Sequence, residues 1–96
     1  MIPKFSHYAV GELCDKLFVR NLPKDVVEED LYWIFGRYFP DDKVMRRDLE
    51  IKILSGRMKG NAFLLFPTVA IAKQALQENT GYILRSKPII IEYSKN

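Results

Sequence analysis

Apolar residues alternate with other residues in four short segments, and this period of two is the pattern of a half-buried β-strand. The segments are residues 17–22, 49–53, 60–66 and 89–93. Residues 82–84 leave open a short additional strand. We therefore predict four strands, each with one face turned to a hydrophobic core.

Two other segments have the spacing of helices. In residues 26–35 the apolar positions recur at helical intervals, acidic residues stand near the start, and Gly36 can end the helix. Residues 69–76 are rich in helix formers and are followed by a stop signal at residues 79–81.

The order of these elements predicts the fold. We expect residues 37–47 to form a long connection with a turn at residues 40–42. The order is then β-α-β-β-α-β, which folds as a four-stranded antiparallel sheet with two helices on one face. This is a ferredoxin-like α+β fold. We expect it to occupy residues 16–94, with an N-terminal extension at 1–15 and a C-terminal end at 95–96.

Helices on one face leave the other face open, and strand parity predicts which side chains lie there. Leu17 and Val19 should point to the helices. Phe18 and Arg20 should then point away. The same parity places on the open face Glu50, Lys52, Leu54, Asn61, Phe63, Leu65, Ile90 and Glu92. The opposite parity would bury Arg20 unpaired, at a cost of several kcal/mol.

Two aromatic rings, Phe18 and Phe63, are therefore expected to be exposed on neighbouring strands. Such rings stack on unpaired bases, and each base stacked contributes roughly 1–3 kcal/mol. With Leu65 and Ile90 they form an apolar surface of a size that marks a binding site. The pattern predicts binding of single-stranded RNA.

The charge distribution agrees with a polyanionic partner. The 96 residues, 48% hydrophobic and 28% charged, suit one globular domain with a net charge of +3. Acidic residues gather in residues 25–30 and basic residues in residues 43–59, which favours approach of a polyanion from one side. Arg46, Arg47 and Lys52 are expected to add long-range attraction to phosphate.

Several function classes lack their residues in this sequence. Cysteine and histidine occur once each, as Cys14 and His7, so neither an internal disulfide nor a metal site of familiar spacing can form. Residues 21–25 lack the anion-binding glycine loop that an acylphosphatase-like enzyme needs, and no nucleophile–base set is present. No apolar run approaches the roughly eighteen residues of a membrane span. We expect no enzyme activity, cofactor, metal, small-molecule substrate or membrane partner.

Residues 17–22 and 59–66 resemble the two ribonucleoprotein signatures of the RNA recognition motif, and the resemblance covers about residues 16–94. The third position of the longer signature is usually aromatic, whereas this chain has Asn61. An amide there can donate and accept along a base edge. The resemblance implies RNA binding, with Phe63 stacking on a base.

The run of residues 57–63 is similar to that of spliceosomal hairpin-binding motifs. These are the A protein of the U1 snRNP, its U2 relative, and the C-terminal motif of the 65K protein of the U11/U12 di-snRNP. Their basic loop threads through an RNA hairpin loop. The resemblance implies that Lys59 reaches the loop-closing base pair, that Arg57 supports it and that Met58 packs at the loop.

Other short segments are most similar to the 65K motif, and a paralogous group of the RNA-binding protein 41 type shares many of them. They are residues 15–18, 34–38, 56–60, 79–82 and 87–89. The resemblance implies recognition of a spliceosomal snRNA hairpin such as the 3′ stem-loop of U12 snRNA. It also implies a nuclear role in pre-mRNA splicing by the minor spliceosome, beside other snRNP proteins.

Three further residues complete the expected RNA contacts: Asn21 near the end of the first predicted strand, Lys95 beyond the last, and Glu92. Hairpin binders tend to carry an amide in place of Glu92. A carboxylate would repel phosphate but could accept from a cytosine amino group. The expected RNA-binding residues are thus Phe18, Arg20, Asn21, Lys52, Arg57, Met58, Lys59, Asn61, Phe63, Leu65, Glu92 and Lys95.

An alternative on the same fold is a protein-binding variant that clasps a tryptophan peptide through an acidic first helix and an Arg-x-Phe loop. The acids of residues 25–30 fit it superficially. Residues 81–85, after the second helix, contain no Arg-x-Phe, while both RNA signatures are intact. RNA binding is therefore the favoured hypothesis.

Overall fold

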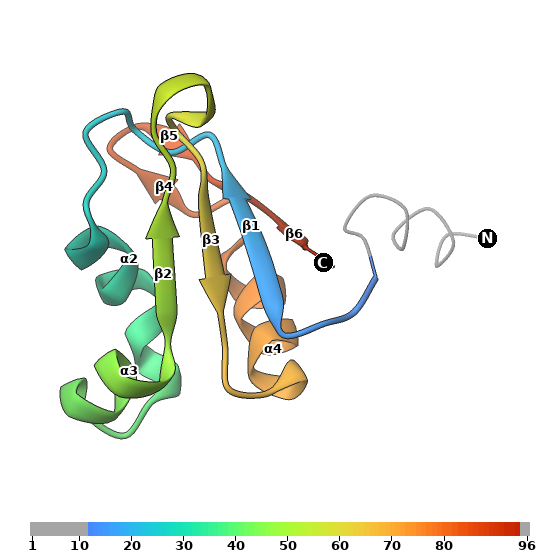
Figure 1. Cartoon of the computed structure of the whole chain (residues 1–96). Helices are drawn as coiled ribbons and strands as arrows, with labels where there is room; N and C mark the ends of the chain where they lie inside the picture. Colours follow the sequence, from blue (N-terminus) through green and yellow to red (C-terminus); the bar gives the residue numbers. More distant parts are fainter. Residues whose placement is uncertain (1–11, 95–96) are drawn as a thin grey trace.

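The main sheet has four antiparallel strands in the order β2-β3-β1-β6. The computed structural model describes residues 12–94 (Figure 1). The strands are β1 Lys16–Arg20, β2 Glu50–Ile53, β3 Ala62–Leu65 and β6 Ile90–Tyr93. Strand β1 lies inside the sheet because it pairs with both β3 and β6. The predicted α+β fold is confirmed, with strands slightly shorter than expected.

Two helices, α2 Glu28–Phe35 and α4 Val69–Asn79, lie on the same side of this sheet (Figure 1). Helix α2 starts two residues later than predicted and continues into the 3₁₀ turn η1 Gly36–Tyr38. Its first turn holds three acids, which the positive end of the helix dipole favours. Within residues 12–94, none of the helices is long and apolar enough to cross a membrane.

The long connection predicted for residues 37–47 is wrong, because most of it is a helix, α3 Asp42–Asp48. Asp41 caps this helix: its carboxylate accepts a hydrogen bond of 2.8 Å from the Val44 N–H. Met45 is buried, and a Cβ added to Gly36 would lie 2.6 Å from its sulfur. The glycine therefore lets α3 pack closely against the end of α2. The turn predicted at residues 40–42 thus contains the N-cap, Asp41, and the first residue of α3.

The segment left open at residues 82–84 does form a strand, β4 Ile83–Leu84, which pairs with β5 Lys87–Pro88. Arg85 and Ser86 make the two-residue turn, with positive φ values of 46° and 72° that suit a tight hairpin. The Arg85 guanidinium donates to Asp30 at 3.0 and 3.1 Å. This hydrogen bond lowers the pKa of the Asp30 carboxyl and links the hairpin to α2.

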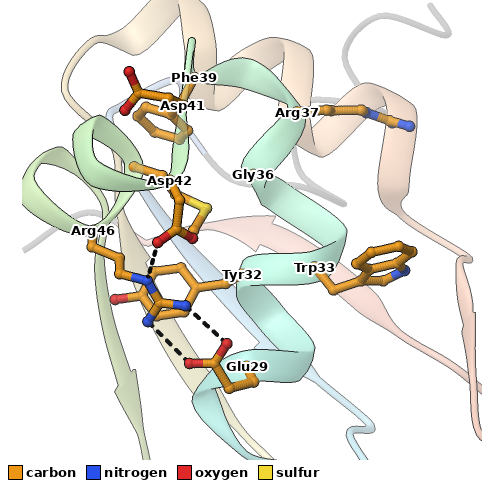
Figure 2. A pocket seen from close by; sticks show the side chains of 10 residues that line it. Glu29, Tyr32, Trp33, Gly36, Arg37, Phe39, Asp41, Asp42 and Arg46 are labelled. Atoms are coloured by element: carbon orange, nitrogen blue, oxygen red, sulfur yellow. Dashed lines mark hydrogen bonds and ion pairs between the residues drawn. The ribbon is translucent and has the colours of Figure 1, made fainter.

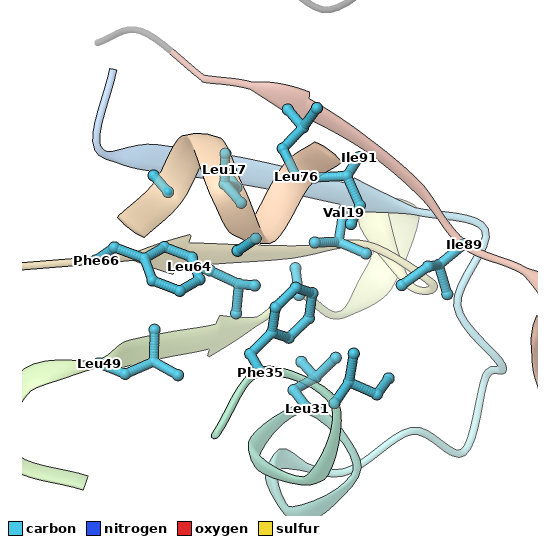
Figure 3. Packing of buried hydrophobic residues seen from close by; sticks show 14 of the residues in the cluster. Leu17, Val19, Leu31, Phe35, Leu49, Leu64, Phe66, Leu76, Ile89 and Ile91 are labelled. Atoms are coloured by element: carbon cyan, nitrogen blue, oxygen red, sulfur yellow. The ribbon is translucent and has the colours of Figure 1, made fainter. Parts of the chain in front are cut away.

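The core lies between the helices and the covered face of the sheet (Figure 3). The strands contribute residues of one parity, such as Leu17, Val19 and Leu64, each with 0% exposure. Phe35 of α2 meets Phe66 edge-on, with ring centroids 6.1 Å apart. The predicted parity of the strands is therefore confirmed.

One buried polar side chain, Asn79, lies at the end of α4 and is 2% exposed. Its amide donates to the Ala75 carbonyl at 2.8 Å and to the Tyr38 hydroxyl at 2.9 Å. Its carbonyl oxygen accepts from Arg37 at 3.1 Å. These bonds satisfy the buried amide and join α4 to η1.

The Asp41 cap yields a stability prediction. We expect Asp41→Ala to lower the free energy of unfolding by about 1 kcal/mol, because an N–H of the first turn of α3 loses its acceptor. Asp41→Asn should leave it nearly unchanged, since asparagine caps helices as well as aspartate does. Urea denaturation of both variants measures this. An unchanged stability in Asp41→Ala would show that the cap does not stabilise α3, and equal losses would assign the effect to the charge of Asp41.

Candidate nucleic-acid interface

The two predicted rings lie side by side on the open face of the sheet. Phe18 of β1 is directly opposite Phe63 of β3, and their ring centroids are 5.0 Å apart with planes tilted by 40°. Both side chains are partly exposed. Leu65 beside them is also partly exposed, and Ile90 of β6 is 43% exposed. The structure thus assembles the apolar platform that the strand parity predicts.

The rings belong to a straight row of four residues that crosses the whole sheet. Lys52 of β2 is opposite Phe63, Phe63 is opposite Phe18, and Phe18 is opposite Glu92 of β6. Side chains that are directly opposite have Cβ atoms about 4.5–5.5 Å apart. A flat ligand stacked on the platform therefore has a cation at one edge and a carboxylate at the other.

Glu92 has a counter-charge on the open face. The Arg20 guanidinium lies 3.6 Å from one of its oxygens, with 49% and 34% of the two side chains exposed. Such an exposed pair contributes only about 0–1 kcal/mol to stability. Its effect on the site is electrostatic: Arg20 offsets the repulsion between Glu92 and an approaching phosphate.

Lys16 is a residue of this face that the sequence reasoning missed. Its ammonium lies 4.5 Å from the centroid of the Phe63 ring, within the range of a cation–π contact. The available signal was parity, because Lys16 precedes Phe18 and Arg20 in the same alternation. Lys16 adds positive charge beside the platform.

A basic loop joins β2 to β3 at one end of the platform. It contains the 3₁₀ turn η2 Gly56–Met58 and is closed by a hydrogen bond of 3.0 Å from the Leu54 N–H to the Asn61 carbonyl. Gly60, with φ of 93°, accepts from the Leu22 N–H at 2.9 Å. The loop therefore has a defined shape. Its exposed side chains are Arg57, Met58 and Lys59.

Two predicted contact residues have structural partners. The Asn61 side chain donates to the Met58 carbonyl at 2.8 Å, so one of its N–H groups helps to shape the loop. Asn21 follows β1 with φ of 64°, and its amide donates to the Pro88 carbonyl at 2.8 Å. The structure thus gives Asn21 a role in holding β5 near the end of β1. Lys95 lies outside the described residues.

The structure does not favour a phosphate-binding role for the arginines of α3. Arg46 donates to both oxygens of Glu29, at 2.9 and 3.0 Å, and to Asp42 at 2.8 Å (Figure 2). The bond to Arg46 lowers the pKa of the Glu29 carboxyl. Arg47 donates to Asp48 at 2.8 Å. Of the three basic residues expected to attract phosphate, only Lys52 lies on the open face.

Arg46 and its two acidic partners border a pocket of about 350 Å³ between α2 and α3, on the helical side of the molecule (Figure 2). Its apolar lining includes Tyr32, Phe39 and Met45. Trp33 stands at its edge and is 81% exposed. The pocket and the open sheet are thus separate surfaces.

The acids expected in a peptide-clasping helix are mostly paired within the domain. Asp25 and Asp30 bind Arg85, and Glu29 binds Arg46. Glu28 is the one acid of residues 25–30 for which the described part of the chain shows no ion pair. This pairing disfavours the alternative in which the acids of α2 help to clasp a tryptophan peptide.

No group of three or more potential metal ligands among His, Cys, Asp and Glu occurs within residues 12–94. The open face offers stacking surfaces, hydrogen-bonding groups and charges. All three suit unpaired nucleotides.

Comparison with known proteins agrees with this geometry. The family model of the RNA recognition motif matches residues 17–90. The chain is 39% identical over 95 residues to the U11/U12 small nuclear ribonucleoprotein 65 kDa protein of Arabidopsis thaliana, covering 98% of this chain and 22% of that protein. It is also 39% identical over 95 residues to human RNA-binding protein 41, covering 99% of this chain and 22% of the relative. The chain thus spans about a fifth of the length of these relatives.

A solved structure is similar over nearly the whole chain. The C-terminal RNA recognition motif of the U11/U12 65K protein superposes with a TM-score of 0.80 and 38% sequence identity. The match covers 97% of this chain and 79% of that one.

The platform yields a binding prediction. We expect Phe63→Ala to weaken binding of single-stranded RNA by about 1–3 kcal/mol, because a base loses its stacking surface. Trp33→Ala is the matched control, since it removes an exposed ring from the helical side and should leave the affinity unchanged. Fluorescence anisotropy titrations at constant salt measure both. Unchanged affinity for Phe63→Ala would exclude this ring from the interface.

Proposed function

Since this chain belongs to the RNA recognition motif family of RNA-binding domains, we propose that its target is an RNA stem-loop. The unpaired bases of the loop stack on Phe18 and Phe63, and the basic loop between β2 and β3 contacts the top of the stem. The observation that carries this proposal is the position of that basic loop directly beside the stacking platform. Its relatives are RNA-binding and snRNP proteins, and the chain is not an enzyme.

A hairpin loop suits this arrangement for a physical reason. The sheet needs unpaired bases with open faces, which a hairpin loop supplies and a duplex does not. The exposed cations of the protein loop between β2 and β3, Arg57 and Lys59, need phosphates at a set distance from those bases. A stem provides them next to its closing pair, whereas an unstructured strand must first be ordered at an entropic cost.

The relatives suggest which RNA this is. One is named for the U11/U12 snRNP, and the similar solved domain is the C-terminal motif of a U11/U12 65K protein. We therefore propose the 3′ stem-loop of U12 snRNA as the target, with a nuclear role in splicing by the minor spliceosome. Contacts with other snRNP proteins are proposed for the longer protein to which such a domain belongs.

A test of the stem-loop proposal compares two RNAs. We expect a U12-type 3′ stem-loop to bind at least about tenfold more tightly than an unstructured RNA of the same composition, a difference of about 1.4 kcal/mol. Isothermal titration calorimetry at a fixed salt concentration measures both affinities. Equal, weak and salt-sensitive binding to the two RNAs would refute the stem-loop proposal and leave only non-specific attraction to phosphate.

A second test concerns the basic loop. Lys59→Gln should weaken binding of the stem-loop more than binding of the unstructured RNA, because Lys59 is proposed to contact the closing pair. Lys73→Gln removes the same charge from an exposed position on α4 and is the matched control. Equal losses for the two variants, measured in the same titrations, would mean that Lys59 contributes only net charge.

A further inference from the structure

We infer that Glu92 makes the Phe18 half of the platform selective for a base with an exocyclic amino group and selects against uracil. This inference rests on the proposal that RNA binds on the open sheet, but it does not require a stem-loop. It concerns the identity of one base, which the family relationship leaves undetermined.

Glu92 lies where it can contact the edge of a base stacked on Phe18. Glu92 is directly opposite Phe18 in the pairing of β1 with β6, and both side chains lie on the open face. A base stacked on the Phe18 ring therefore presents one of its edges to Glu92. An ionised carboxylate only accepts hydrogen bonds, so the edge that fits must donate.

The carboxylate of Glu92 can still accept hydrogen bonds. The guanidinium paired with it, that of Arg20, lies at 3.6 Å, which is longer than a hydrogen bond. Within residues 12–94 no hydrogen bond to the Glu92 side chain is found, so its oxygens keep their capacity to accept. Arg20 meanwhile holds positive charge beside them. Glu92 can therefore accept a hydrogen bond, while Arg20 offsets the repulsion between its carboxylate and RNA phosphates.

The bases differ in the groups that their edges present to Glu92. Cytosine, adenine and guanine each present an amino group that donates to a carboxylate. Uracil presents carbonyl oxygens on both sides of its single ring N–H, so its edge places lone pairs against Glu92. A site built for a hydrogen-bond donor disfavours a ligand that leaves its acceptor unpaired.

Lys52, at the other end of the row, does not give a comparable preference. Its ammonium is a flexible donor that can bind phosphate oxygens as well as base carbonyls. Glu92 can make a favourable contact only with a donor on a base or sugar. The carboxylate is therefore the group in the row from which base selectivity is expected.

The test uses two unstructured RNA octamers, all cytidine and all uridine, so that the register of binding does not matter. We expect the domain to bind the cytidine octamer about tenfold more tightly, within the range for a hydrogen bond to a charged group. In Glu92→Gln the affinities for the two octamers should differ by no more than about twofold, because an amide can both donate and accept. Fluorescence anisotropy at one salt concentration gives the four dissociation constants.

Glu50→Gln is the matched control. Glu50 is an exposed carboxylate of β2 on the same face, but it pairs with Leu65 and so lies outside the row. Its loss should strengthen binding of both octamers by a similar factor and leave the ratio near tenfold. The change in the ratio therefore separates a base contact from a change in overall charge.

The outcomes separate this inference from the proposal that RNA binds on the open sheet. A cytidine-to-uridine ratio near one in the unmodified domain, or a ratio unchanged in Glu92→Gln, would overturn the inference while RNA binding stands. Failure of the unmodified domain to bind either octamer would overturn the inference, and the stem-loop titrations described above would then decide separately whether RNA binding stands. Circular dichroism melts of the variants establish that each is folded under the conditions of the titration.

Discussion

The covering of one face of the sheet, and only one, is the constraint on which the rest of the structure depends. Strand side chains alternate between faces, so burying Leu17 and Val19 under the helices leaves Phe18 and Arg20 on the other side. Shifting the strand by one residue would bury a guanidinium in an apolar core, at a cost far above the gain from covering one ring. The exposed aromatic platform is therefore maintained by the stability of the core behind it.

The central position of β1 extends this constraint to the whole open face. Because β1 pairs with β3 on one side and β6 on the other, Phe18 has Phe63 at one edge and Glu92 at the other. The stacking surface and the acceptor are thus placed by backbone hydrogen bonds, whose geometry varies little. Groups held in this way lose little conformational freedom when a ligand binds, which favours affinity.

The two sides of the domain use their charges differently. On the helical side, arginines and acids neutralise each other in pairs such as Arg46 with Glu29 and Arg85 with Asp30. On the open side, Lys52 and the basic loop project cations around the platform. The open side consequently presents cations where a polyanion would lie. The pairing on α2 also leaves fewer of its carboxylates available to the tryptophan peptide of the protein-binding alternative.

The sequence alone determined the order of the elements along the chain, two of the three α-helices of residues 12–94 and most side chains of the open face, because these follow from short-range periodicity and parity. Only the tertiary structure decided the contacts between distant residues. Helix α3 has seven residues, too few for a clear period, and it depends on the packing of Met45 against Gly36. The contacts of Lys16 with Phe63, and of Asn21 with Pro88, likewise need strands far apart in the chain to be adjacent. Local spacing predicts where a side chain points, but its partner depends on which segments the fold brings together.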